Sequence, residues 1–240
     1  MGILVFLLFD AILSVFICAK NYKVYSVLDK YGFSLEYLRT FERERIIGKP
    51  FNIAYAVEYA EIFEHIGQPA DAIKYLNTLT VPESANPSVK VSYFYVYVTS
   101  ALRIGNLNIA EDMWERSMPM IQKVQSNFGY SVSSYLLYLA LVMIDLYAAK
   151  VTGSSERLQR AYDQTVSFMN SANHKRYPIK ECSFEIVLLY ELKAMGRTDE
   201  FNAFLPKVKE KVENFKPLFT GIKNLTVDSF NKAANGELPI

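Results

Sequence analysis

The chain has 240 residues, of which 51% are hydrophobic and 21% are charged, and its 26 basic and 25 acidic residues leave a formal net charge of +1. This apolar content excludes disorder as the main state, and the length suits one domain or one repeat array. The balanced charge, without acidic or basic blocks, argues against a nucleic-acid-binding protein. Two cysteines, Cys18 and Cys182, provide neither a disulfide framework nor metal-ligand spacing. Because the sequence also lacks phosphate-binding and metal-binding motifs, no metal and no cofactor are expected.

The chain begins with its longest apolar run, residues 3–19, which Asp10 and Ser14 interrupt. Twelve Leu, Ile, Val or Phe side chains in this run favour membrane insertion. Each contributes about 0.3–0.6 kcal/mol, which outweighs a cost of about 3 kcal/mol for a central Asp. We therefore predict one transmembrane helix that continues toward the interfacial residue Tyr22. The alternative is a cleaved signal peptide, although nothing basic precedes the run and large residues stand where a cleavage site needs small ones.

Three lysines, Lys20, Lys23 and Lys30, follow the run, and by the positive-inside rule they place the rest of the chain in the cytoplasm. A glycosylation sequon at Asn224 would suit the opposite side of the membrane. An ionisable residue inside a span usually faces a partner, so Asp10 is expected to contact a polar group on another membrane helix. Alternatively, the helix shifts until Asp10 lies near the surface, or the segment is removed.

Residues 1–30 are thus predicted to be an anchor and stalk, and residues 31–50 a linking helix. Ser34 is a suitable N-cap for a helix that runs to about Ile47, and Gly48-Lys49-Pro50 ends it. The mixed acidic and basic residues along this helix predict a solvent-exposed face.

Residues 56–79 predict two helices folded back on each other. Apolar or small residues keep helical spacing in the first helix, at Ala56, Tyr59, Ala60 and Phe63. Gly67 suits the left-handed end of that helix, and Pro69 suits the first turn of the next. Ala72 and Leu76 face back toward the first helix, so the pair forms an αα-hairpin.

The hairpin pattern recurs along the chain. Gly67 and Gly105 are 38 residues apart, as are Ala72 and Ala110, which indicates an internal repeat. A third hairpin is predicted from residues 135–151 and 157–169, and a fourth begins at Pro178, turns at Gly196 and is capped by Thr198. A last helix within residues 217–234 would cover the exposed end.

These residues resemble the tetratricopeptide repeat (TPR) family over residues 52–212. The matching positions are Ala60, Phe63, Gly67, Ala72, Leu76 and Pro82 in the first unit, Gly105, Ala110 and Trp114 in the second, and Gly153, Ala161 and Gly196 later. The resemblance implies an all-α fold, a TPR-like α-solenoid of antiparallel helix pairs, here with an N-terminal transmembrane helix. The repeats would span residues 51–216, and residues 217–240 would form the capping helix and tail.

The resemblance also implies a concave face that binds a protein or peptide partner. The family's groove positions fall on Val57, Glu61, Glu64, His65, Tyr95, Thr99, Leu102, Arg103, Met143, Tyr147, Lys150, Ile186, Tyr190 and Lys193. The charged and aromatic members of this set are the expected partner-binding residues: Glu61, Glu64, His65, Tyr95, Thr99, Arg103, Tyr147, Lys150, Tyr190 and Lys193. Chaperone-binding members of the family carry Lys and Asn where this chain has Val57 and Glu61, which disfavours a C-terminal carboxylate ligand.

No catalytic motif is present, and the chain is not expected to be an enzyme. Its two histidines are His65 and His174; His65 stands at a helix C-terminus, where a cation interacts well with the helix dipole. The sequence therefore predicts a membrane-anchored TPR-like adaptor or scaffold. The alternatives are a secreted or surface-exposed helical-repeat binding protein with a cleaved signal, and a regulator or enzyme that senses a peptide or small ligand in the groove.

Overall fold

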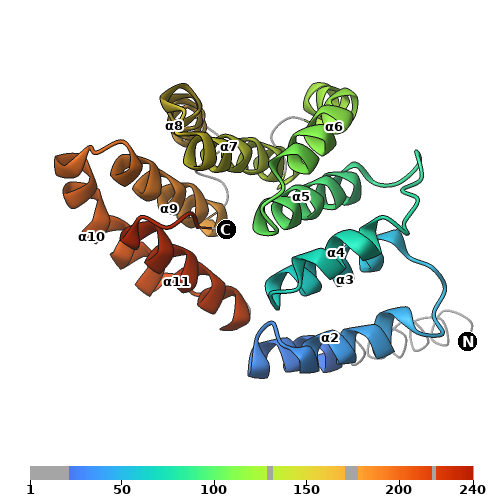
Figure 1. Ribbon diagram of the computed structural model, residues 1–240. Coiled ribbons are helices and arrows are strands. Elements are labelled where there is room, and N and C mark those ends of the chain that lie inside the picture. The colour runs from blue at the N-terminus through green and yellow to red at the C-terminus, as the bar shows by residue number, and fades with distance from the viewer. Residues whose placement is uncertain (1–21, 129–131, 171–177, 218–219, 240) are drawn as a thin grey trace, which may run out of the picture.

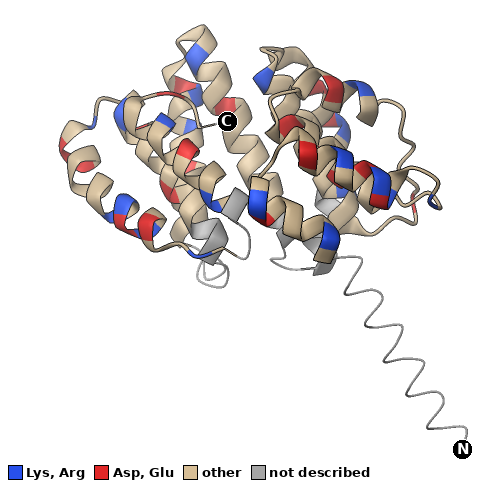
Figure 2. Ribbon diagram, turned by 90° about the horizontal axis from the view of Figure 1, so that it is seen from below, with Lys and Arg blue, Asp and Glu red and all other residues tan. Residues whose placement is uncertain are grey.

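The computed structural model describes residues 22–128, 132–170, 178–217 and 220–239. Within these ranges the secondary structure is helical and contains no strand, which confirms the all-α prediction. The helices follow one another around a curved array, in which α5, α7 and α9 lie on the inner side and α6, α8 and α10 on the outer side (Figure 1). Basic and acidic residues are interspersed along the helices (Figure 2).

The described chain begins with a helix over residues 22–31, which Gly32 ends with a positive φ of 63°. Helix α2 (Leu35–Phe41) follows, and the Ser34 hydroxyl accepts a hydrogen bond from the Tyr37 N–H at 3.2 Å, as predicted for an N-cap. The expected continuation toward Ile47 is a π-helix, η1 (Glu42–Ile46). A π-helix is rare and is found mostly as a single turn, so periodicity in the sequence could not indicate it.

We correct the prediction of a single-pass membrane protein. None of the helices within the described ranges is long and apolar enough to cross a bilayer. Within the described residues, the helix that was to continue the span comprises residues 22–31 and carries Lys23, Asp29 and Lys30, while its Val24 and Leu28 are buried against residues of α2 and α3. The apolar run of residues 3–19, with Asp10, lies outside the described residues.

Helices α3 (Ile53–His65) and α4 (Pro69–Leu76) form the predicted hairpin. Gly67 joins them with φ of 80°, a left-handed conformation that glycine adopts without the steric cost a Cβ would impose. Ala60 and Ala72 are fully buried where the two helices pack together, which lets their backbones approach closely.

The remaining helices repeat this arrangement. They are α5 (Pro87–Arg103), α6 (Leu107–Phe128), α7 (Val132–Thr152), α8 (Ser155–Asn170), α9 (Pro178–Ala194), α10 (Thr198–Asn214) and α11 (Thr220–Asn235). Helices α5 and α6, α7 and α8, and α9 and α10 pack as pairs, and α11 packs on α9 and α10. One local prediction is wrong: Thr198 is not the N-cap of α10 but its first residue, and its hydroxyl donates to the Gly196 carbonyl at 3.4 Å.

One hydrophobic cluster runs through the array from α3 to α11, with Ala101, Ala110 and Ala161 fully buried within it. A second cluster joins the helix of residues 22–31 to α2 and α3 through Tyr37 and Phe41. The inner helices are therefore held from several sides, and they support the concave face described next.

Candidate functional site

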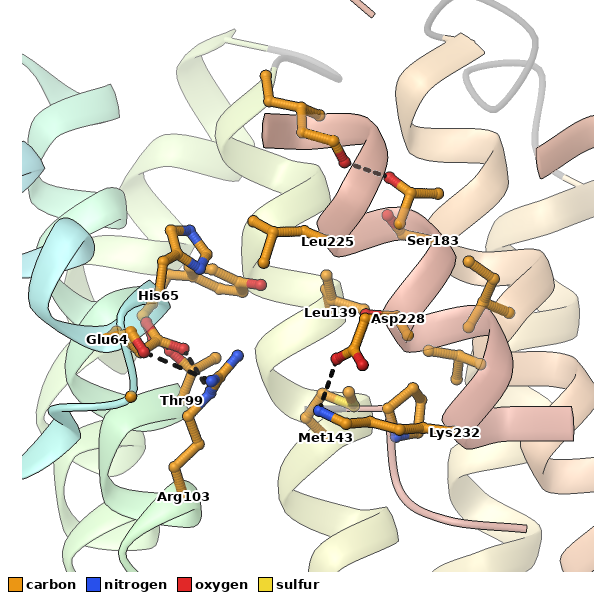
Figure 3. Close-up of a pocket in the computed structure, with 18 residues that line it drawn as sticks. Glu64, His65, Thr99, Arg103, Leu139, Met143, Ser183, Leu225, Asp228 and Lys232 are labelled. Carbon is orange, nitrogen blue, oxygen red and sulfur yellow. Dashed lines mark hydrogen bonds and ion pairs between the residues drawn. The ribbon is translucent and has the colours of Figure 1, made fainter. Parts of the chain in front are cut away.

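The concave side of the array contains a cavity of about 420 Å³ between α3, α5, α7, α9 and α11. Figure 3 shows side chains from these helices converging on it. The lining residues are Glu64, His65, Gly67, Tyr95, Thr99, Arg103, Leu139, Met143, Ser183, Ile186, Val187, Ile222, Leu225, Thr226, Asp228, Ser229, Lys232 and Pro239.

One wall is charged and is formed by α3 and α5. Glu64 is only 3% exposed, and its Oε2 accepts a hydrogen bond from the Thr99 hydroxyl at 2.9 Å. The Arg103 Nε lies 3.0 Å from Glu64 Oε1, and Arg103 Nη1 donates to the Glu64 carbonyl at 3.5 Å. Burial raises the pKa of Glu64, although nearby His65 and Arg103 and the Thr99 hydroxyl oppose this change. The buried carboxyl group thus holds Arg103 in place at the edge of the cavity.

His65, at the end of α3, belongs to the same wall. Its Nε2 lies 3.6 Å from Glu61 Oε1, and its ring centroid is 4.4 Å from that of Phe33. Burial lowers the pKa of His65, but the acidic Glu61 and Glu64 outweigh this effect and leave it raised. Its Nδ1 is buried and makes no hydrogen bond, and the Arg103 Nε is close to Glu64 without hydrogen-bond geometry. Two polar atoms of this wall are thus buried without a hydrogen bond among the described residues.

The opposite wall belongs to α11 and also carries both charges. Lys232 Nζ lies 2.9 Å from Asp228 Oδ2, one helical turn away. Leu225 lies above this pair, and Leu139 and Met143 of α7 lie between the two walls (Figure 3). The cavity thus has an apolar floor between two walls that each pair an acid with a base.

The structure brings five of the ten predicted partner-binding residues to this cavity. These are Glu64, His65, Tyr95, Thr99 and Arg103, all from α3 and α5. Met143 and Ile186, which the family's groove positions also include, line it as well. Glu61 does not line the cavity but interacts with His65 at its margin.

The predicted residues of the later helices lie elsewhere. Tyr147 is beside the Gly105 turn, where its hydroxyl would be 3.4 Å from a Cβ at Gly105. Lys193 Nζ donates to the Ala234 carbonyl at 2.6 Å, so it anchors the end of α11. Tyr190 is buried, which raises its pKa, and Lys150 is exposed near the end of α7. Val57 and Leu102, two further groove positions, are also buried in the core.

The irregular repeat explains this division. Gly105 and Gly153 are 48 residues apart and Gly153 and Gly196 are 43 apart, whereas the first two units repeat after 38. Groove positions carried over from a regular repeat therefore mostly reach the cavity in the first two units, whereas in the last two units Met143 and Ile186 reach it and the other four do not.

The α11 wall was missed by sequence reasoning. Leu225, Asp228, Ser229 and Lys232 follow the i, i+3, i+4, i+7 spacing of one helical face. That spacing could have identified the face, but it does not indicate which helices the face opposes.

The described part of the chain brings no three His, Cys, Asp or Glu residues together in a way that could hold a metal ion. The apolar floor and the paired charges of the cavity suit non-covalent binding of a ligand that is itself part apolar and part polar. Comparison with known proteins finds no family model, no curated protein and no solved structure that matches this chain.

Proposed function

We propose that this chain is a TPR-like helical-repeat module that binds an extended peptide segment of a partner protein in the concave cavity. The observation that carries the proposal is the convergence of Glu64, His65, Tyr95, Thr99 and Arg103 on one cavity from two successive repeats. The repeat itself is supported by its turns, because Gly67, Gly105, Gly153 and Gly196 all have φ between 70° and 81°.

The chemistry of the cavity favours a peptide over a strongly charged ligand. Arg103 and Lys232 are balanced by Glu64 and Asp228, so neither an anion nor a cation gains a net attraction. A peptide group offers one N–H donor and one C=O acceptor, and each wall of the cavity carries both an acidic acceptor and a basic donor. Apolar side chains of the same segment can occupy the floor.

The size of the cavity supports the same class of ligand. Its volume of about 420 Å³ lies within the range of roughly 300–1,000 Å³ that is usual for ligand pockets. It can take a few residues of an extended chain but not a folded domain, so specificity would come from a short segment.

The test begins with a random peptide library displayed on phage and selected on the full chain. Selected peptides are then titrated by fluorescence anisotropy against the full chain, a Ser229→Trp variant and an Asn231→Trp variant. Ser229 lines the cavity, so its replacement fills the space with an indole, whereas Asn231 is exposed on the same helix and does not line it. Circular dichroism and thermal melting verify that both variants fold.

Selected peptides should bind the Ser229→Trp variant at least about tenfold more weakly than the unmodified chain. Their affinity for the Asn231→Trp variant should lie within about twofold of that for the unmodified chain. Equal affinity for all three proteins would place binding outside the cavity. Selection without any enriched peptide would also contradict the proposal. Arg103→Ala is a poorer test, because it leaves the buried Glu64 carboxyl group without its arginine and can destabilise the fold.

A further inference from the structure

The chain turns back on itself directly after α11. Gly236 has φ of 80°, its N–H donates to the Ala233 carbonyl at 3.0 Å, and the Glu237 N–H donates to the Lys232 carbonyl at 2.8 Å. This pair of bonds is the Schellman arrangement that ends a helix and redirects the chain. The tail segment, residues 236–239, therefore does not continue along the helix axis.

The tail segment instead runs onto the concave side of the array. Residues 237–239 are not helical. Leu238 is 5% exposed and belongs to the main hydrophobic cluster, and Pro239 is buried and lines the cavity. In Figure 1 the chain that follows α11 passes α9 and runs into the curve of the array. A short non-helical segment thus forms part of the cavity's lining through Pro239, while its Leu238 packs into the main hydrophobic cluster.

Helix α9 holds the beginning of the tail segment. Lys193 Nζ donates to the Ala234 carbonyl, and a Cβ at Gly236 would lie 3.3 Å from the Lys193 Cε. The Lys193 side chain therefore lies close against the turn, and position 236 favours glycine, which has no side chain. A Schellman cap explains the turn, but it does not require Pro239 to lie against the cavity.

We propose that the tail segment is a displaceable part of the cavity wall, and that the partner peptide takes its place with the same pattern, a leucine followed by a proline in an extended chain. The inference rests on the proposed function and specifies its ligand. A partner must then displace the tail segment, and its apparent affinity is its intrinsic affinity multiplied by the fraction of molecules in which the tail segment is released.

The experiment uses the full chain, a Leu238→Ser variant that weakens tail packing, and a Leu35→Ser variant as the control. Leu35 is 52% exposed on α2 and does not line the cavity. The probe is a fluorescein-labelled synthetic peptide with the sequence of residues 235–240 and both ends blocked. Anisotropy reports binding, and circular dichroism verifies the fold of each variant.

The probe should bind Leu238→Ser at least about tenfold more tightly than it binds the unmodified chain or Leu35→Ser, because the place of the tail segment is vacated only in the first. Adding Ser229→Trp to Leu238→Ser should abolish this gain. A probe that binds all three proteins equally, or none of them, overturns the inference. A lower melting temperature of Leu238→Ser without a gain in probe binding also overturns it, because Leu238 would then only cap α11.

A second measurement serves if Leu238→Ser does not fold. The Leu238 methyl resonances of the full chain are followed by NMR while unlabelled probe is added. They should move toward the positions of a solvent-exposed leucine as the probe displaces the tail segment, and unchanged resonances at saturating probe count against it.

The library peptides separate this inference from the proposed function. If they bind in a Ser229-dependent way but equally well to the full chain and Leu238→Ser, the proposed function stands and the tail inference fails. If no library peptide depends on Ser229 while the probe still gains affinity for Leu238→Ser, the tail inference stands as an intramolecular contact and the proposed function fails.

Discussion

Single buried acids have different roles in this protein, according to the partners that surround them. Glu64 and Asp145 each contact arginine, whereas among the described residues Glu191 on α9 accepts one hydrogen bond, from the Thr165 hydroxyl at 2.9 Å. The second carboxyl oxygen of Glu191 is buried and makes no hydrogen bond. Burial therefore raises the pKa of Glu191 to about 8.

This pKa predicts how stability depends on pH. The folded chain holds the Glu191 proton more tightly than the unfolded chain, whose pKa is near 4.5. The resulting stabilisation is complete below that pH and is lost as the pH rises through about 8. Glu191→Gln should remove this dependence and raise the free energy of unfolding above pH 8, by an amount on the order of a few kcal/mol.

Urea denaturation between pH 5 and pH 9 measures the effect. Glu213→Gln is the matched control, because the Glu213 side chain is 65% exposed on α10. If Glu191→Gln and the unmodified chain lose stability in parallel across this range, the buried carboxyl group is not the cause.

Ala72 tests the close helix contact in the first hairpin. It is fully buried on α4, while Ala70 on the same helix is exposed. Ala72→Leu should lower the free energy of unfolding by about 1–3 kcal/mol through overpacking, whereas Ala70→Leu should change it by less than about 0.5 kcal/mol. Thermal and urea denaturation of the two variants give the comparison, and equal stability would contradict the proposed close packing.

At the level of whole elements, an ion-pair network joins the inner helix α7 to the outer helices α6 and α8. The Asp145 side chain of α7 is fully buried and accepts hydrogen bonds from Arg157 Nη1 at 2.8 Å and from Arg160 Nε at 2.6 Å, both on α8. Arg157 Nη2 also donates to Glu111 of α6 at 2.9 Å. The network therefore fixes α6, α7 and α8 relative to one another.

Removing the central acid should therefore be costly. Asp145→Asn leaves two arginines without their shared carboxylate, and we expect a loss of about 3 kcal/mol, because the arginine groups are partly exposed and recover some hydration. Asp112→Asn is the control: its ion pair with Arg116 is 68% exposed on each side and should contribute less than about 1 kcal/mol. A similar loss for both variants in urea denaturation would show that the network does not stabilise the array.

At the scale of the molecule, stability should vary along the array. Helix α7 packs on α5, α6 and α8 and also contacts α9, whereas α2 and η1 pack on each other and on α3. Regions with many packing neighbours open less readily than those at the end of an array.

Native-state hydrogen exchange measures this gradient. Amides of α7 should exchange most slowly, and those of α2 and η1 should exchange at least about tenfold faster, since they can open without disrupting the main cluster. Uniform protection from α2 to α7 would indicate a single cooperative unit instead.

Local features of the fold could be predicted from the sequence alone because they depend on neighbouring residues. The turns at Gly67, Gly105, Gly153 and Gly196 need a positive φ, and the sequence places glycine at each. Pro69 and Pro87 begin helices, as their fixed φ favours. The helical faces also follow directly from spacing, whereas the candidate site residues of the first two units came from the resemblance to the TPR family.

The remaining features depend on contacts between residues far apart in the chain, and only the tertiary structure decides them. Glu64 meets Arg103 from 39 residues away, and the Asp228 face of α11 meets the cavity because the array curves and brings its last helix opposite α3 and α5. Periodicity shows which residues share a face, but the curvature depends on every packing angle and loop length before it. For that reason the first wall of the cavity was predicted from the sequence, whereas its second wall and the tail segment beside it were not.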